Sequence, residues 1–359
     1  MNKLLPFNMP PVAKGGMLGM LSGAGGAGGH GNFYELLGRT ELTSAGDTIT
    51  VSSLTSKPYL MVLSSILNDG GGTITGETRF NSDSGSNYAD RYSTNGGSDS
   101  TNTSATFIDG LNTTNSEGEQ FAVSFINNIS DEEKLMIEHD MARSSSGAGN
   151  APFRREIVGK WTDTSTVISG VTKVNLEAGS YEAGSEVVVL GYDPANPGTG
   201  IWEELASVEL GSAGDSIDTS TFTAKKYLMV QTNGIASGAI NFNFTFNSDT
   251  GSNYAERYSE NGGSDGTATS QSEIRPRIGG ESTGHYGVYY ISNITDKEKL
   301  LVGHTMTGGS STGAGNAPTR SEEIAKWVNT SSQINRIEVE NTAGGSFNTG
   351  STIKVWGFD

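Results

Sequence analysis

The 359-residue sequence contains no cysteine, which removes disulfide bonds, thiolate metal ligands and cysteine nucleophiles from consideration. Positive charge is scarce, because 23 lysines and arginines stand against 40 aspartates and glutamates, for a formal net charge of −17. Such a chain repels a phosphate backbone, so direct binding to nucleic acid is not expected. No apolar run of about 18 residues occurs, so no single helix is expected to span a bilayer.

Charged residues are few, and glycine is abundant. Hydrophobic residues make up 34% of the chain and charged residues 18%, whereas there are 50 glycines. Glycine together with many serines, threonines and asparagines is typical of short strands joined by turns. The composition therefore predicts an all-β chain.

The sequence contains two copies of one unit. The segment Phe80–Tyr88 (FNSDSGSNY) recurs as Phe246–Tyr254 (FNSDTGSNY), an offset of 166 residues. A comparison of Arg79–Asp99 with Thr245–Asp265 gives 17 identities in 21 positions, which chance does not produce. Further matches in the same order are Lys57–Val62 with Lys225–Val230, Gly147–Pro152 with Gly313–Pro318, and Lys160–Trp161 with Lys326–Trp327.

The repeat divides the chain into four parts. Residues 1–32 form an N-terminal arm, residues 33–193 the first copy, residues 194–200 a linker, and residues 201–359 the second copy. The prolines and glycines of the linker cannot extend a helix. Because the linker is short, we expect the two copies to touch.

Apolar residues alternate along several segments of each copy. A period of two in both copies predicts strands rather than helices, and each copy has about seven or eight such segments. We therefore expect two tandem jelly-roll-like β-sandwich units, with the strand connectivity left open. In one such segment of each copy, four alternating residues are expected to share one face of the strand. They are Leu135, Ile137, His139 and Met141 in the first copy and Leu300, Val302, His304 and Met306 in the second. Other predicted strands are 59–65, 73–80, 121–127, 156–161, 171–177 and 186–192.

The glycine-rich arm mixes apolar residues with glycines and cannot build a core of its own. We expect it to dock on a partner protein and to order there, with the glycine run as a flexible tether. A disordered tail is one alternative, and lipid contact is another because some glycines are spaced four apart. Prolines at positions 6, 10 and 11 argue against a signal peptide. The residues expected to bind the partner are Leu4, Leu5, Phe7, Met9, Met17, Leu18, Met20 and Leu21.

No catalytic site is predicted. Gly23–Gly28 fits a dinucleotide-binding motif, but no strand precedes it and no helical pattern follows. Gly309–Gly313 fits the G-x-S-x-G motif of hydrolases, yet the first copy does not keep it, so a hydrolase using Ser311 is only an alternative. Both His139 and His304 recur beside leucine and methionine, which favours buried core histidines over catalysis. We therefore expect neither cofactor nor metal.

The most strictly repeated block carries two further candidate sites. Asn81, Asp83 and Gly85 space oxygen atoms as a calcium loop does, but Asx turns account for the same residues. Four tyrosines share one strand face in their respective copies. They are candidates for stacking on sugar rings or for an interface, and packing or assembly is favoured. These residues are Tyr88, Tyr92, Tyr254 and Tyr258.

Three segments of the first copy carry a family resemblance, namely the opening Glu35–Thr40 (ELLGRT), the block Phe80–Tyr88, and the closing strand Gly184–Gly191 (GSEVVVLG). In these segments the chain resembles a group of virion proteins from tailed phages and marine viruses. The second copy differs from this pattern in its opening segment, which reads ELASV at Glu204–Val208. The resemblance covers both copies but not the arm. It implies a jelly-roll-like virion surface component without catalytic residues.

We therefore expect a non-enzymatic structural protein at the surface of a virus particle, as a decoration, fibre or spike component. Its expected partners are other virion proteins, bound through the arm, and further copies of itself, with a host glycan as a third. One alternative is a capsid shell protein with a double jelly roll, which copy number per particle would distinguish. The other is a glycan-binding module.

Overall fold

The structure of the chain is a computed structural model that describes residues 34–114, 118–196, 198–276, 283–309 and 313–359. Within these ranges the chain forms strands, turns and loops but no helix, and hence none that could cross a membrane. The prediction of an all-β chain is confirmed. The N-terminal arm lies outside the described residues, so its docking on a partner stays a prediction.

The strands of each copy follow the repeat. In the first copy they are β1 (Glu35–Glu41), β2 (Thr48–Val51), β3 (Tyr59–Ile66), β4 (Ile74–Thr75), β5 (Glu77–Phe80), β6 (Tyr88–Thr94), β7 (Ser100–Ala105), β8 (Asn112–Thr113), β9 (Gln120–Asn127), β10 (Lys134–Ala142), β11 (Phe153–Trp161), β12 (Val171–Val174) and β13 (Glu186–Tyr192). In the second copy they are β14 (Glu203–Glu209), β15 (Ser216–Asp218), β16 (Tyr227–Gly234), β17 (Asn243–Phe246), β18 (Tyr254–Glu260), β19 (Gly266–Gln271), β20 (His285–Ser292), β21 (Lys299–Thr307), β22 (Thr319–Trp327), β23 (Ile337–Glu340) and β24 (Thr352–Phe358).

Each copy is a sandwich of one large and one small sheet. In the first copy the large sheet has eight strands in the order β1-β13-β3-β9-β10-β11-β6-β7, and the small sheet has the order β2-β12-β5. The second copy repeats both orders strand for strand, as β14-β24-β16-β20-β21-β22-β18-β19 and β15-β23-β17. All the pairings are antiparallel. The expectation of two β-sandwich units is confirmed. The expected strand number was too low, because the prediction did not include β1, β2, β7 and β8, of which β1 and β7 lie in the large sheet.

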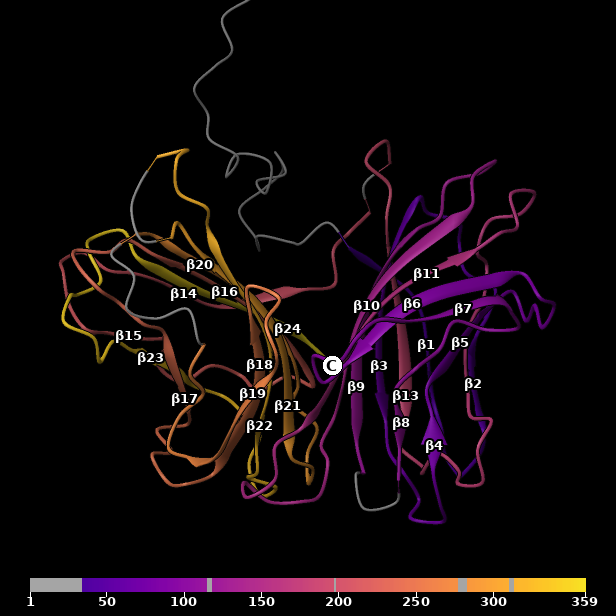
Figure 1. Cartoon of the computed structure of the whole chain (residues 1–359), viewed down its shortest axis with the longest axis horizontal. Helices are drawn as coiled ribbons and strands as arrows, with labels where there is room; N and C mark the ends of the chain where they lie inside the picture. The colour runs from indigo at the N-terminus through magenta and orange to yellow at the C-terminus, as the bar shows by residue number, and fades with distance from the viewer. Residues whose placement is uncertain (1–33, 115–117, 197, 277–282, 310–312) are drawn as a thin grey trace, which may run out of the picture.

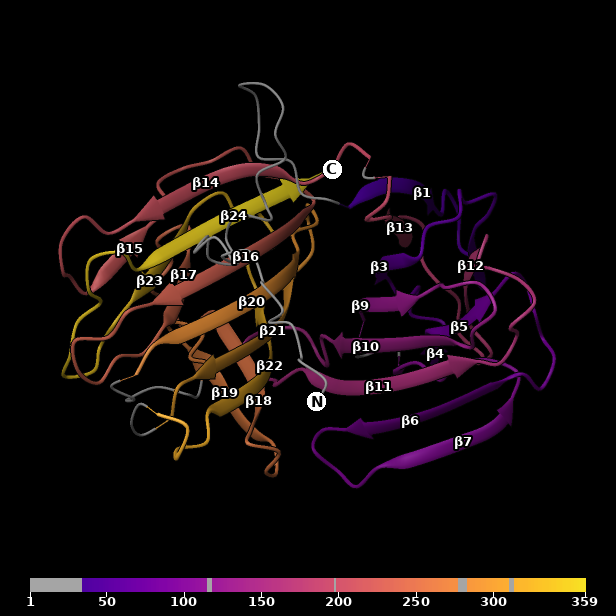
Figure 2. The same cartoon turned by 90° about the horizontal axis from the view of Figure 1, so that it is seen from above.

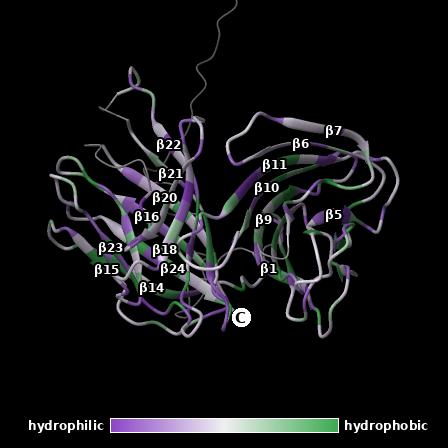
Figure 3. Ribbon diagram, turned by 60° about the horizontal axis from the view of Figure 1, so that its bottom comes forward, coloured by the Kyte–Doolittle hydropathy of each residue, from purple (hydrophilic) through white to green (hydrophobic). Residues whose placement is uncertain are grey.

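The hydrophobic core of each copy lies between its large and small sheets. In the first copy, Val62 and Val189 of the large sheet share one buried cluster with Ile49 and Val171 of the small sheet. Hydrophobic residues lie along the strands of both copies (Figure 3). The alternation of apolar side chains along these strands thus reflects burial on at least one sheet face.

The two copies lie side by side with their large sheets in contact (Figures 1 and 2). Strand β3 shows how both of its faces are buried, since Leu60 and Val62 point into the core of the first copy. Met61 and Leu63 point the other way, into a third cluster that includes residues of the second copy. A strand buried on both faces carries a continuous apolar run rather than an alternating one, as β3 does.

Leu135, Ile137, His139 and Met141 share one face of β10 as expected, but that face points away from the core of the first copy. Strand β10 does alternate and is not helical, but its inward face carries Met136 and Glu138. Leu135 and Ile137 lie on the outer face, where about half of each side chain is exposed. The sequence pattern indicated the period correctly but not the face, because the inward Glu138 is balanced by a buried lysine from a distant strand, Lys173.

Candidate functional site

The two large sheets meet at a pair of histidines. His139 of β10 and His304 of β21 occupy equivalent positions in the two copies, and their ring centroids lie 4.1 Å apart at an interplanar angle of 66°. Phe125 and Tyr290, a second equivalent pair, are also in contact with centroids 6.0 Å apart. The centre of the contact between the copies is therefore built from like positions.

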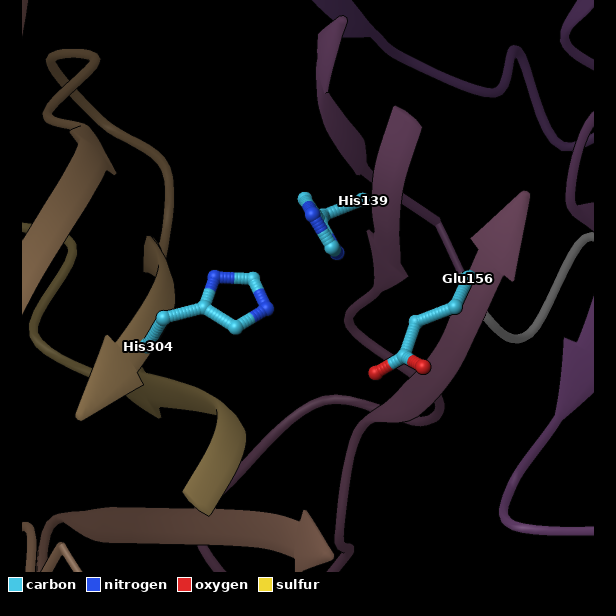
Figure 4. A group of neighbouring side chains, drawn as sticks. All are labelled: His139, Glu156 and His304. Atoms are coloured by element: carbon cyan, nitrogen blue, oxygen red, sulfur yellow. The ribbon is translucent and has the colours of Figure 1, made fainter. Parts of the chain in front are cut away.

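Strand register places a carboxylate beside each imidazole. His139 pairs with Glu156 of β11, and His304 pairs with Glu322 of β22. Residues directly opposite each other in antiparallel strands have Cβ atoms about 5 Å apart, so their side chains share one face. In Figure 4 the two rings face each other between the copies, and the Glu156 carboxylate points toward the same space.

Arg154 is paired with three carboxylates around this space. Its guanidinium donates to Glu156, to Glu322 of the second copy at 3.3 Å, and to Asp265 of the second copy at 2.6 Å between Nη2 and Oδ1. The Arg154 side chain is 7% exposed and that of Asp265 is 2% exposed. A buried charge is tolerated when it is paired in this way, so the ion pairs also hold the two copies together.

Burial disfavours the protonated form of both imidazoles. Burial, reinforced by His304 and by the Arg154 guanidinium, lowers the pKa of His139 to about 3, and burial also lowers the pKa of His304. Among the residues that the structure describes, neither ring donates or accepts a hydrogen bond. The rings line a cavity of about 10 Å³, room for roughly one water molecule or one ion. Imidazole nitrogens that line such a cavity are metal ligands by chemical type.

These histidines correct a sequence-based expectation. His139 and His304 are not satisfied core residues, because both are half-buried at the contact between the copies. A signal for this was present, since a glutamate follows each histidine in the next predicted strand, Glu156 after 17 residues and Glu322 after 18. The distance between His139 and His304 along the chain gave no indication that they would meet.

The four tyrosines divide into two pairs. Tyr88 and Tyr254 lie in the cores of their copies, where each ring stacks on a tryptophan, as Tyr88 does on Trp161 at 6.4 Å between centroids. Tyr92 and Tyr258 are half-buried, and the guanidinium of Arg155 lies 4.3 Å from the Tyr92 ring centroid. A sugar platform made of all four rings is therefore not formed in this structure, because two of them are buried.

The candidate calcium loop is used for packing. The Asp83 carboxylate accepts hydrogen bonds from the Gly85 amide at 2.7 Å, from the Asn87 side chain at 2.9 Å and from the Trp161 indole at 2.7 Å. Although burial opposes it, these hydrogen bonds lower the pKa of Asp83. Asp249 makes the same set of contacts in the second copy. The Asx-turn interpretation thus explains why the block is repeated so strictly.

The hydrolase alternative concerns a loop that is only partly described. Residues 310–312, including Ser311, lie outside the described residues, so that alternative remains untested.

Comparisons with known proteins give little further guidance. No family model matches the chain, and no curated protein matches it. Among solved structures, the mouse laminin alpha1 chain domains LG4-5 match with 10% identity over 96% of this chain and 93% of that chain, at a TM-score of 0.19. The LG1-3 region of the laminin alpha2 chain matches with 8% identity over 87% and 64% of the two chains, at a TM-score of 0.20. Likenesses with such low TM-scores carry no argument about function.

Proposed function

We propose that the protein is a non-enzymatic structural component of a virus particle that displays two β-sandwich copies at the particle surface and assembles head to tail with further copies of itself. The viral setting comes from the resemblance of the repeated motifs to phage virion proteins. Attachment to other virion proteins is assigned to the N-terminal arm. The self-association is supported by an asymmetry between the two copies, which carries the proposal.

The first copy leaves an apolar patch exposed on its large sheet. The patch consists of Leu135, Ile137 and Val158, which are 51%, 52% and 49% exposed. Ile137 and Val158 are cross-strand partners in β10 and β11, and Leu135 lies on the same face. Three large apolar side chains gathered on one face of a sheet indicate an interaction surface.

The equivalent patch of the second copy is already covered. Leu300, Val302 and Ile324 occupy the same three positions in β21 and β22, and they are 1%, 3% and 2% exposed. They belong to the cluster shared by the two copies, together with Phe121 and Met141 of the first copy. The contact within the chain therefore shows how this patch is buried when another sandwich packs on it.

The surface that covers the patch is free in the second copy. Phe121 and Met141 are buried, whereas their equivalents Tyr286 and Met306 are 45% and 43% exposed. One chain thus presents an open patch on the first copy and an open covering surface on the second. Like positions meet at the centre of the contact within the chain, but only one of the two patches is closed there, so the open patch and the open covering surface remain for further chains.

The partner that fits the open patch is accordingly a second copy of this chain. The contact between chains should be weaker than the contact within one, because buried Leu63 and Val188 of the first copy are replaced by Gln231 and Lys354 in the second. Its strength in a particle would come from many such contacts and from the arm.

Light scattering coupled to size-exclusion chromatography tests the assembly. We expect the full chain to form oligomers that grow with concentration, and Ile137→Asp or Met306→Asp to give monomers that remain folded. Leu176→Asp is the matched control, because Leu176 is a similarly exposed apolar residue outside both surfaces. A wild-type chain that stays monomeric at all concentrations would contradict the self-association.

A mixing experiment identifies the contact as head to tail. An equimolar mixture of Ile137→Asp and Met306→Asp chains should yield dimers and nothing larger, because each variant keeps one intact surface. If the mixture forms no complex, the patch of one chain does not bind the covering surface of another, and the head-to-tail contact is rejected.

The viral role has its own test. An antibody raised against the purified chain should label the outside of intact particles, and quantitative mass spectrometry should give its copy number. A number close to that of the shell subunits would favour the capsid shell alternative. Absence from purified particles would reject the viral role.

A further inference from the structure

We infer that His139, Glu156 and His304 form a binding site for one divalent transition-metal ion, best matched by zinc, which joins the two copies of the chain. The site goes beyond the proposed structural role and does not depend on it. His139 and Glu156 come from the first copy, and His304 comes from the second (Figure 4).

The three side chains already converge. One ligand atom from each lies within 4.8 Å of the other two. In a tetrahedral site with metal–ligand distances of about 2.0–2.1 Å, neighbouring ligand atoms lie about 3.3 Å apart. Side-chain rotations that bring the ligand atoms together by about 1.5 Å therefore complete the site without a change in the strands, which register fixes.

The donor atoms are free to bind an ion. Neither imidazole makes a hydrogen bond within the part of the chain that the structure describes, and both rings are half-buried. Arg154 holds Oε1 of Glu156, so Oε2 remains for the metal. The three side chains are only half-buried, so an ion can reach these atoms from solvent.

The charges around the site balance one another. The Arg154 guanidinium is the positive group closest to Glu156, but it is also paired with Asp265 and Glu322 of the second copy. Glu322 lines the same cavity, beside His304. Arg257 also pairs with Asp265, and Arg320 also pairs with Glu322. Three carboxylates thus balance three arginines around the two imidazoles and the Glu156 oxygen that would bind the ion.

The ligand types select the ion. Two imidazoles and one carboxylate suit zinc and its first-row neighbours, whereas calcium and magnesium prefer sets made of oxygen alone. A three-residue set leaves a fourth position for water or for a residue of another molecule. Because the ligands come from both copies, the bound ion would fix the copies to each other at the centre of their contact.

Metal titration of the full chain tests the inference. After dialysis against a chelator, calorimetric titration with ZnCl2 should give one site per chain, and zinc should raise the midpoint of thermal unfolding by a few degrees. With CoCl2, the chain should develop the visible absorption bands of a four- or five-coordinate cobalt ion. No binding of either metal by the folded chain would overturn the inference.

Substitutions assign the ligands. His139→Gln, His304→Gln and Glu156→Gln should each weaken zinc binding at least tenfold and abolish the cobalt bands, while circular dichroism confirms the fold. His285→Gln is the matched control, because His285 lies in the core of the second copy and the first copy carries Gln120 at that position. Binding that persists in both histidine variants, or that is lost in the control, would place the metal elsewhere and reject the assignment.

Discussion

Lys173 and Glu138 form a buried ion pair in the core of the first copy, with 3.0 Å between Nζ and Oε2 and side chains that are 2% and 0% exposed. The equivalent positions of the second copy hold Val339 and Gly303, and no pair exists there. The ring of Tyr289 fills the space instead, since a Cβ on Gly303 would lie 2.4 Å from it. One backbone fold thus supports a polar core in one copy and an apolar core in the other.

This difference predicts the cost of breaking the pair. Lys173→Val should lower the free energy of unfolding by about 3–5 kcal/mol, because Glu138 is left charged and buried. Adding Glu138→Gly and Ser124→Tyr rebuilds the core of the second copy and should restore most of that loss. Urea unfolding of the single and triple variants measures both values. A single variant as stable as the wild type would show that the pair contributes little.

Glu77 of β5 predicts a pH dependence of stability. Burial, reinforced by the charge of Asp109, raises the pKa of Glu77 from 4.5 to about 8. Between these values the folded chain binds more protons than the unfolded chain, so stability should fall by about 1.4 kcal/mol per pH unit for this group as pH rises from 4.5 to 8. Chemical unfolding at pH 5 and pH 8 measures the slope.

The second copy supplies the control for this prediction. Asn243 occupies the position of Glu77, so Glu77→Asn introduces a residue that the fold already accepts. This variant should show a smaller loss of stability between pH 5 and pH 8 than the wild type. An unchanged slope would assign the dependence to other buried acids, such as Asp140, whose pKa is also raised by burial.

Much of the fold could be predicted because the duplication allowed each segment to be checked against its copy. Alternation in both copies identified β10 and β21 as strands, and the repeated Asp83 was correctly read as an Asx turn. Alternation could not identify the inward face, since apolar side chains such as Met61 and Leu63 also cover the outer face where the copies meet. The His139–His304 contact was missed for the same reason, because it depends on how two sheets pack rather than on local pattern.

Deletion of residues 1–32 tests the role of the arm. We expect the truncated chain to unfold at the same temperature as the full chain, because the described core residues all lie within the two copies. Its incorporation into particles should be lost, because the apolar residues expected to dock on a partner are removed. Thermal unfolding and quantification of the protein in purified particles measure the two effects. Normal incorporation of the truncated chain would reject anchoring by the arm.

Leu135 and Leu300 are equivalent leucines of the two copies, but their exposure to solvent differs. Leu300 is 1% exposed beneath the first copy, so Leu300→Ala should lower the free energy of unfolding by about 2–5 kcal/mol through lost burial and a cavity. Leu135 is 51% exposed, so Leu135→Ala should change the stability of the dilute monomer by no more than about 0.5 kcal/mol.

The two variants should differ in the opposite sense when assembly, rather than stability, is measured. At high concentration, Leu135→Ala should have the larger effect on assembly. Leu135→Ala removes apolar area from the surface that a second chain would cover, so it should raise the concentration at which oligomers form. Leu300→Ala leaves that surface intact and should assemble as the wild type does wherever it is folded. Light scattering over a concentration series measures the difference. Equal assembly of wild type and Leu135→Ala would mean that the patch remains solvent-exposed in the oligomer, and the contact between chains would then have to involve another face.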